Sequence, residues 1–151
     1  MILAKKNTAR PNRNYVMNKD YGSLQPGDLI SNRLHKITED TLATYLSAVQ
    51  DRSALLSDSE GVTIAPPMAI AALSLRGVIE DLKIPGGTLH VGQETSNINL
   101  VSIGTELTCK ANVLTNTVRG DWRFLTVTLK VTTSDKTLAL SGKSTIMLPE
   151  G

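Results

Sequence analysis

The chain has 151 residues, of which 40% are hydrophobic and 20% are charged, and this is the size and composition of one globular domain with its own core. Its net charge is only +2 and its basic residues form no long run, so composition does not favour a nucleic-acid-binding protein. No apolar run is long enough to span a membrane, and the single cysteine, Cys109, allows no intramolecular disulfide, so we expect a cytoplasmic protein.

The first segments of the chain are a polar arm and a strand. Residues 1–20 are rich in Asn, Lys and Arg without an apolar period, and we interpret them as a flexible arm before a domain at 21–151. The arm has no long apolar stretch and so lacks the body of a secretory signal. Residues 26–28, Pro-Gly-Asp, predict a turn, and residues 29–37 have strand character.

A first helix is predicted after this strand. Thr38 is a suitable N-cap, and Glu39 and Asp40 are favourable at the positive end of the helix dipole. Apolar residues then recur at helical spacing, namely Leu42, Tyr45, Leu46 and Val49. A polar connector that ends at Gly61 follows this helix.

The second helix is predicted over about residues 66–82. Pro66 and Pro67 indicate its start, because a proline in the first turn gives up no hydrogen bond within the helix. The helix is apolar on most faces as far as Leu75, so we expect protein to surround it. The sequence Pro-Gly-Gly at 85–87 ends it.

The rest of the chain is predicted to form about four strands. Residues 106–113, 125–131 and 138–148 alternate between apolar and polar side chains, and residues 88–100 do so more weakly. Short turns between them favour antiparallel pairing, and a slip of the pattern after Phe124 predicts a bulge or a second buried face there. The predicted fold class is α+β, with a curved antiparallel sheet of about five strands wrapped around one long buried helix. A free sheet edge favours pairing with a second copy.

Short motifs occur along this arrangement in a characteristic order. They are Gly27-Asp28, Val49-Gln50-Asp51, Ile64-Ala65-Pro66-Pro67, the run Gly-Thr-Leu-His-Val-Gly-Gln-Glu at 87–94, and Gly104-Thr105-Glu106-Leu107. From about Tyr21 onward the chain resembles the hotdog fold, and specifically the MaoC-like dehydratase and (R)-specific enoyl-CoA hydratase family. It is most similar to the N-terminal-type halves of double-hotdog dehydratases, in which Ala-Pro-Pro opens the central helix.

The resemblance implies a substrate carried as a thioester on coenzyme A or acyl carrier protein, bound in a tunnel between paired subunits, with no metal or cofactor. It implies reversible addition of water across an α,β-double bond. In catalytic members, an Asp-x-Asn-Pro-x-His motif supplies the acid/base pair, and a backbone N–H at the start of the central helix polarises the thioester carbonyl. Both tasks need groups within hydrogen-bond reach of the reacting atoms.

The acid/base motif is incomplete in this sequence. Aligned on Asp51, the Asn and Pro positions are Ser53 and Ala54, and the His position is Leu56. Leucine cannot transfer a proton, and no histidine lies between His35 and His90, so the usual dyad is absent. Asp51 is then either a retained catalytic carboxylate or the end cap of a polar connector.

The start of the central helix departs from the family pattern too. Catalytic members carry a His-Gly pair there, whereas this chain has Pro66 and Pro67. Because proline has no N–H, the first free donors are expected at Met68 and Ala69, and we predict that Pro67, Met68 and Ala69 contact the substrate. Loss of one such donor costs about 3 kcal/mol in an acyl-transfer enzyme.

His90 is the remaining candidate for a base. It could act with Asp51 or Glu94, or it could be a packed histidine at a subunit contact, hydrogen-bonded to backbone. Strand alternation places Gln93 on the face opposite His90. We interpret His35 as part of a solvated face.

Three basic residues are candidates for binding the phosphates of the carrier. The role of the single thiol is interpreted as well. Arg119, Arg123 and Lys143 could supply clustered donors to a diphosphate or phosphopantetheine, or they could be scattered surface charges. Cys109 lies on an apolar strand face and is interpreted as a small buried hydrophobe.

Three functions follow as hypotheses. The first is an acyl-thioester-binding protein that holds substrate for a dehydratase or hydratase, as a homodimer or in a heterodimer with a catalytic hotdog subunit. The second is a self-sufficient hydratase or thioesterase that uses His90. The third, of another class, is a non-enzymatic dimeric binding or scaffolding protein.

Overall fold

Residues 20–150, which the computed structural model describes, form five strands and two α-helices after a short 3-10 turn at Tyr21–Ser23. In chain order the elements are β1 (Leu29–Lys36), α1 (Glu39–Val49), α2 (Pro67–Leu82), β2 (Leu89–Asn97), β3 (Glu106–Arg119), β4 (Trp122–Thr133) and β5 (Leu138–Pro149). This confirms the α+β class and the five strands. The predicted arm at residues 1–20 lies outside the described residues except for Asp20, so the domain bounds stay a prediction. Within the described range, no helix has the length and apolar character needed to cross a bilayer.

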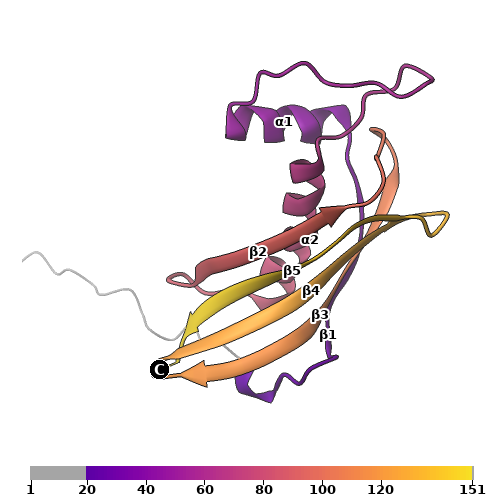
Figure 1. Cartoon of the computed structure of the whole chain (residues 1–151). Coiled ribbons are helices and arrows are strands. Elements are labelled where there is room, and N and C mark those ends of the chain that lie inside the picture. The colour runs from indigo at the N-terminus through magenta and orange to yellow at the C-terminus, as the bar shows by residue number, and fades with distance from the viewer. Residues whose placement is uncertain (1–19, 151) are drawn as a thin grey trace, which may run out of the picture.

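The five strands form one antiparallel sheet in the order β1-β3-β4-β5-β2. The sheet curves around α2, and α1 lies across the end of α2 where that helix begins (Figure 1). The bulge predicted after Phe124 is not there, since Phe124 and Leu125 pair with Thr117 and Asn116 without a shift. The register of this hairpin shifts instead between Val113 and Thr115 on β3.

The core lies between α2 and the concave face of the sheet. Pro66 is the N-cap of α2 and Pro67 is its first residue, as the sequence predicts. The helix packs mainly against β1, β3 and β4. The predicted central helix is confirmed, with buried residues along its length from Ala69 to Leu82, while Met68 is 58% exposed and Ile79 is exposed as well.

Two glycines allow backbone elements to approach closely. A Cβ atom at Gly77 of α2 would lie 2.5 Å from the hydroxyl oxygen of Ser31 on β1. A Cβ atom at Gly142, in the middle of β5, would overlap with the carbonyl oxygen of Glu94 on β2. The absence of a side chain therefore sets the distance from α2 to β1 and from β5 to β2.

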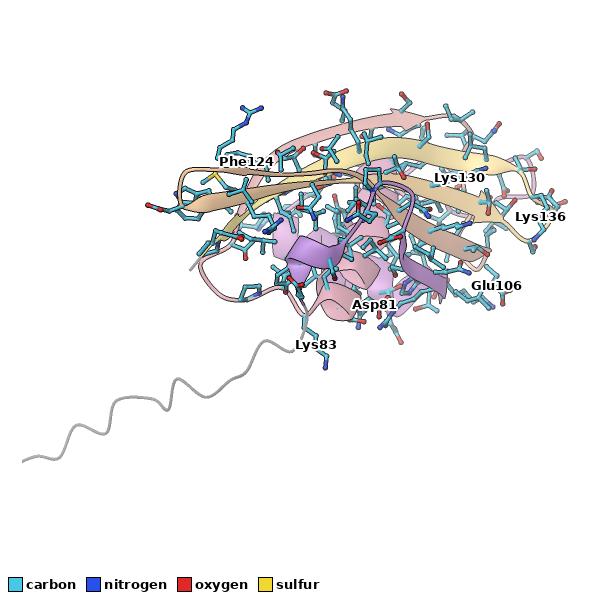
Figure 2. The ribbon with its side chains drawn as sticks, turned by 90° about the horizontal axis from the view of Figure 1, so that it is seen from below. Asp81, Lys83, Glu106, Phe124, Lys130 and Lys136 are labelled. Carbon is cyan, nitrogen blue, oxygen red and sulfur yellow. The ribbon has the colours of Figure 1, made fainter. Side chains whose placement is uncertain are left out.

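The edge strand β1 is fixed to α2 by a charged network. Arg33 donates to Asp81 through Nη2 at 2.6 Å and through Nε at 3.1 Å, and its Nη1 donates to Glu80 at 2.5 Å. Arg76 also donates to Glu80, at 2.8 Å. Figure 2 shows Asp81 on the helical side of the sheet. This network closes the β1 edge of the concave face.

Candidate functional site

Asp51 is held in the turn that ends α1. Gln50 adopts a left-handed conformation with φ 55°, and the Asp51 N–H donates to Leu46 O at 3.0 Å. The Asp51 carboxylate accepts the Ser53 N–H at 2.8 Å. Hydrogen bonds from Ser53 to the carboxylate hold the pKa of Asp51 below its ordinary value. An exposed carboxylate in this state forms a turn and has no proton to donate at neutral pH.

The start of α2 offers one backbone donor to a ligand. The Ala69 N–H, predicted to be free, donates to Pro66 O at 2.9 Å. Pro67 has no N–H. Of the three predicted substrate-binding residues, only Met68 presents an N–H without a partner in the described part of the chain. An oxyanion at this helix start would therefore meet a single donor.

A small cleft of about 100 Å³ adjoins this helix start. It is lined by Ala65, Pro67, Ile70 and Ala139 together with residues 97–101. The Ala65 N–H donates to Val101 O at 2.7 Å, which holds the approach to α2 against the segment that follows β2. The cleft therefore places Pro67 next to the end of β2.

Several large apolar side chains are exposed on the connector, on α2 and on the segment after β2, namely Leu55, Leu56, Val62, Met68, Ile98 and Leu100. The hydrogen bond from Ile64 N–H to Leu56 O, at 2.8 Å, joins the connector to the approach to α2. Leu56, which the sequence alignment predicts at the position of the histidine of catalytic members, is 71% exposed.

His90 lies at the other end of α2. Its Nε2 atom forms a hydrogen bond with Ser144 Oγ at 2.9 Å, and it lines a cavity with Val78 and Ile84. Asp51 follows α1, at the end where α2 begins (Figure 1). The 16 residues of α2 extend over about 24 Å. One chain therefore does not bring His90 and Asp51 together, and a pairing across a dimer stays a prediction.

A bulge in β2 separates Glu94 from His90. The register with β5 shifts between His90 and Gly92, so that Gln93 lies opposite Ser144 and Glu94 opposite Lys143. Glu94 forms an ion pair with Lys143 at 3.2 Å. A slip of one residue exchanges the two faces of a strand, so the expectation that Gln93 faces away from His90 is wrong. Glu94 is the residue that faces away.

The two predicted phosphate-binding arginines lie at the β3–β4 hairpin, at the end of the sheet away from α1 (Figure 1). Arg123 is 11% exposed in its side chain. Its guanidinium donates to Glu150 at 2.8 and 2.6 Å and to Asn116 at 2.9 Å. Arg119 lies over the Phe124 ring, and Figure 2 shows Phe124 at one end of the sheet. The structure does not bring these arginines to Pro67 or Met68.

Two further titratable residues are buried to different degrees. Cys109 is buried as predicted, and burial raises the pKa of its thiol to about 11. His35 is half-buried, with Nε2 shielded from solvent and without a partner, so its interpretation as part of a solvated face is wrong. Burial, followed by Arg76 and Arg33, lowers the pKa of His35.

Sequence reasoning missed two residues beside His90. Ser144 is buried at 1% exposure, and the hydroxyl oxygen of Thr88 is buried without a hydrogen bond. The alternation of β5 could have identified Ser144 as inward-facing, since Ile146 and Leu148 share its phase. Thr88 lies in a turn, where no period indicates a side-chain direction. No group of three His, Cys, Asp or Glu residues within 20–150 could hold a metal ion.

Comparisons with known proteins agree with this architecture. No protein-family model matches the chain, and no curated protein does. The solved structure of R-hydratase PhaJ1 from Pseudomonas aeruginosa matches with a TM-score of 0.71 and 21% identity, over 87% of this chain and 86% of that one. The MaoC-like dehydratase from Rhodospirillum rubrum matches at 0.68 and 19%, over 85% and 94%.

A third matching structure is that of a protein complex. The HadBC (3R-hydroxyacyl-ACP dehydratase) complex from Mycobacterium tuberculosis matches with a TM-score of 0.66 and 14% identity, over 81% of this chain and 96% of that one. At these identities the likeness establishes the fold. The resemblance stated from the sequence motifs is thus confirmed at that level: the chain has the hotdog fold of the MaoC-like dehydratases and (R)-hydratases.

Proposed function

We propose that this protein binds acyl thioesters, on coenzyme A or acyl carrier protein, as the substrate-holding subunit of an enoyl hydratase or 3-hydroxyacyl dehydratase in the cytoplasm. The observation that supports the proposal is a hotdog fold like that of the hydratases combined with a sequence motif that, aligned on Asp51, has Leu56 where catalytic members have histidine. The Asp51 carboxylate accepts a hydrogen bond from Ser53. On this alignment the chain keeps the fold and lacks the usual acid/base pair.

The chemistry left to one chain is binding. The Met68 N–H, beside the apolar cleft at Pro67, can donate a hydrogen bond to the carbonyl oxygen of a thioester. Addition of water also needs a group that takes a proton and one that returns it. A partner subunit with an intact Asp/His pair would supply them.

The partner is proposed to cover the open side of α2 and the edge strand β2. Leu89 and Val91 of β2 are half-exposed, as are Met68 and Ile98. The HadBC complex gives a precedent for a dehydratase assembled from more than one subunit. The partner is either a second copy or a catalytic hotdog protein.

Binding and turnover of crotonyl-CoA and of longer enoyl-CoA thioesters test the function. We expect calorimetry to show binding and the purified chain to hydrate none of them at an ordinary enzymatic rate, on the order of 10 s⁻¹. Met68→Pro removes the donor N–H in the first helical turn, where proline is tolerated, and should weaken binding about 3- to 10-fold. Met68→Leu keeps the N–H and is the matched control. Hydration at a full rate by the isolated chain would contradict the substrate-holding role.

A self-sufficient hydratase or thioesterase is the second candidate, and the hydrogen bond between His90 and Ser144 favours it. In that case, His90→Gln abolishes turnover and leaves thioester binding within a factor of about 3. Absence of any thioester binding would instead favour the scaffolding hypothesis.

Sedimentation tests the assembly. Val91→Lys places a charge on β2 at the proposed interface and should weaken self-association, or association with the catalytic subunit, at least about 10-fold. Val118→Lys is matched in residue type and exposure, since Val91 is 49% and Val118 48% exposed. Equal effects of the two substitutions would argue against β2 as the pairing edge.

A further inference from the structure

A second cavity, of about 260 Å³, lies at the end of α2 away from Pro67. It is enclosed by the C-terminal half of α2, the turn at 84–88 and strands β4 and β5. Its walls are predominantly apolar, formed by Leu75, Val78, Ile84, Pro85, Val127 and Ile146. A volume of this order accommodates a short aliphatic chain and excludes a nucleotide.

Three polar side chains interrupt these apolar walls. The Thr88 hydroxyl is shielded from solvent and has no hydrogen-bond partner within residues 20–150. Ser144, 1% exposed, shares a hydrogen bond with His90 on the same wall. A buried hydroxyl without a partner costs free energy in the folded state. A ligand that draws the Thr88 hydroxyl toward the cavity by a turn about χ1 and hydrogen-bonds to it would remove that cost.

The charges around the cavity select against an anionic ligand. Neither lysine nor arginine is among the lining residues. The cavity adjoins the C-terminal end of α2, where the helix dipole is negative. A carboxylate would therefore be desolvated without a compensating cation. A hydroxyl or a carbonyl carries no such penalty.

We propose that this cavity binds a short aliphatic chain bearing an uncharged hydroxyl or carbonyl group, with Thr88 as its hydrogen-bond partner. The chain is either a free alcohol or ketone, or the far end of an acyl group whose thioester is bound at Met68. The second source rests on the proposed function, and the first does not.

Titrations followed by NMR chemical shifts of the cavity residues test the ligand class. With the full chain at pH 7.5, 1-hexanol and 2-hexanone are expected to bind at least about 10-fold more tightly than hexanoate. Equal or tighter binding of hexanoate would overturn the selection for an uncharged group. No binding of hexanol, hexanone or hexane would overturn the site, and would leave a cavity occupied by water alone.

Thr88→Val tests the proposed hydrogen bond, because valine has nearly the same shape without the hydroxyl. The hexanol affinity should fall about 3- to 10-fold, the range of one neutral hydrogen bond, while the affinity for hexane stays unchanged. Thr95→Val, the same change on β2 outside the cavity, should alter neither affinity. The melting temperature of Thr88→Val should not fall, because the replaced hydroxyl has no partner. A fall, or an unchanged hexanol affinity, would contradict the proposal.

Acyl thioesters distinguish the two sources. If the far end of an acyl group enters the cavity, an enoyl-CoA with a terminal hydroxyl binds more tightly than the plain enoyl-CoA of equal length, and Thr88→Val removes the difference. If the ligand is free, hexanol binding stays sensitive to Thr88→Val while the two thioesters bind alike or not at all. Failure of the thioester arm alone refutes the proposed function without refuting this site.

Discussion

The two edge strands of the sheet, β1 and β2, differ in how far their side chains are buried and contacted by α2. On β1, Ile30 and Ser31 are buried, and Arg33 is joined to Asp81 and Glu80 of α2. On β2, every side chain except that of Thr95 is exposed. One edge is closed against the central helix, whereas the other is left without a neighbour.

This difference favours β2 over β1 as the edge for the proposed pairing with another chain. An unpaired strand with exposed apolar side chains favours association unless charge or distortion prevents it. The bulge at His90–Gly92 distorts only the start of β2, and Leu89 and Val91 remain exposed. The substrate-holding proposal uses the same edge, since the cleft at Pro67 borders the end of β2.

The largest expected effect compares an aliphatic truncation on each edge. Ile30→Ala removes a side chain buried on β1 and should lower the free energy of unfolding by about 3 kcal/mol. Val91→Ala on β2 should lower the free energy of unfolding by no more than about 0.5 kcal/mol at low protein concentration. Urea unfolding measures both. The cost of Val91→Ala should rise with protein concentration if a partner covers β2, and a constant cost would remove that support.

The next effect concerns the charged network of β1. Arg33→Met leaves Asp81 without its bidentate donor and should destabilise the fold by less than half as much as Ile30→Ala, because these side chains are partly solvated. The matched control is Arg76→Met, which removes a single contact to Glu80 from a more exposed position. A larger loss in the control would mean that the network does not fix β1.

The smallest effect is a pH dependence carried by His35. Its pKa in the folded state lies below the ordinary value of 6.5, so the unfolded chain takes up the proton first as pH falls. The contribution of neutral His35 to the free energy of unfolding is therefore complete above about pH 6.5. It is lost as pH falls through the folded-state pKa. His35→Gln should reduce the loss of stability between pH 7 and pH 5, measured by thermal unfolding. Leu34→Gln, on the exposed face of the same strand, should leave the slope unchanged.

Local sequence rules predicted the helices and strands well, and the register less well. Thr38 caps α1 and the prolines begin α2, because caps and prolines act through their own backbone. The bulge at His90–Gly92 was not predictable, since its position depends on which residues of β5 lie opposite. The same limit applies to Arg123, whose partners are Asn116 on the other strand of the β3–β4 hairpin and Glu150 after β5.

The candidate site divides along the same lines. The absent N–H groups at Pro66 and Pro67 are properties of single positions, and the sequence showed them. The absence of the usual dyad at Leu56 stays a prediction from the motif alignment. Two hydrogen bonds could be specified only by the three-dimensional geometry. The Ala69 N–H donates to Pro66 O, and His90 forms a hydrogen bond with Ser144. The apolar pattern predicted the burial of α2, but it did not show that Met68 and Ile79 are exposed.

The bare backbone at Gly142 has a consequence for how variation in this protein would be interpreted. Any residue with a side chain there would push the carbonyl of Glu94 outward and loosen the strand that carries His90. Such a variant would lose ligand affinity and oligomerisation together, although position 142 touches neither a substrate nor a second subunit in these proposals. A mutational scan would thus mark Gly142 as functionally essential when its contribution is clearance between two strands.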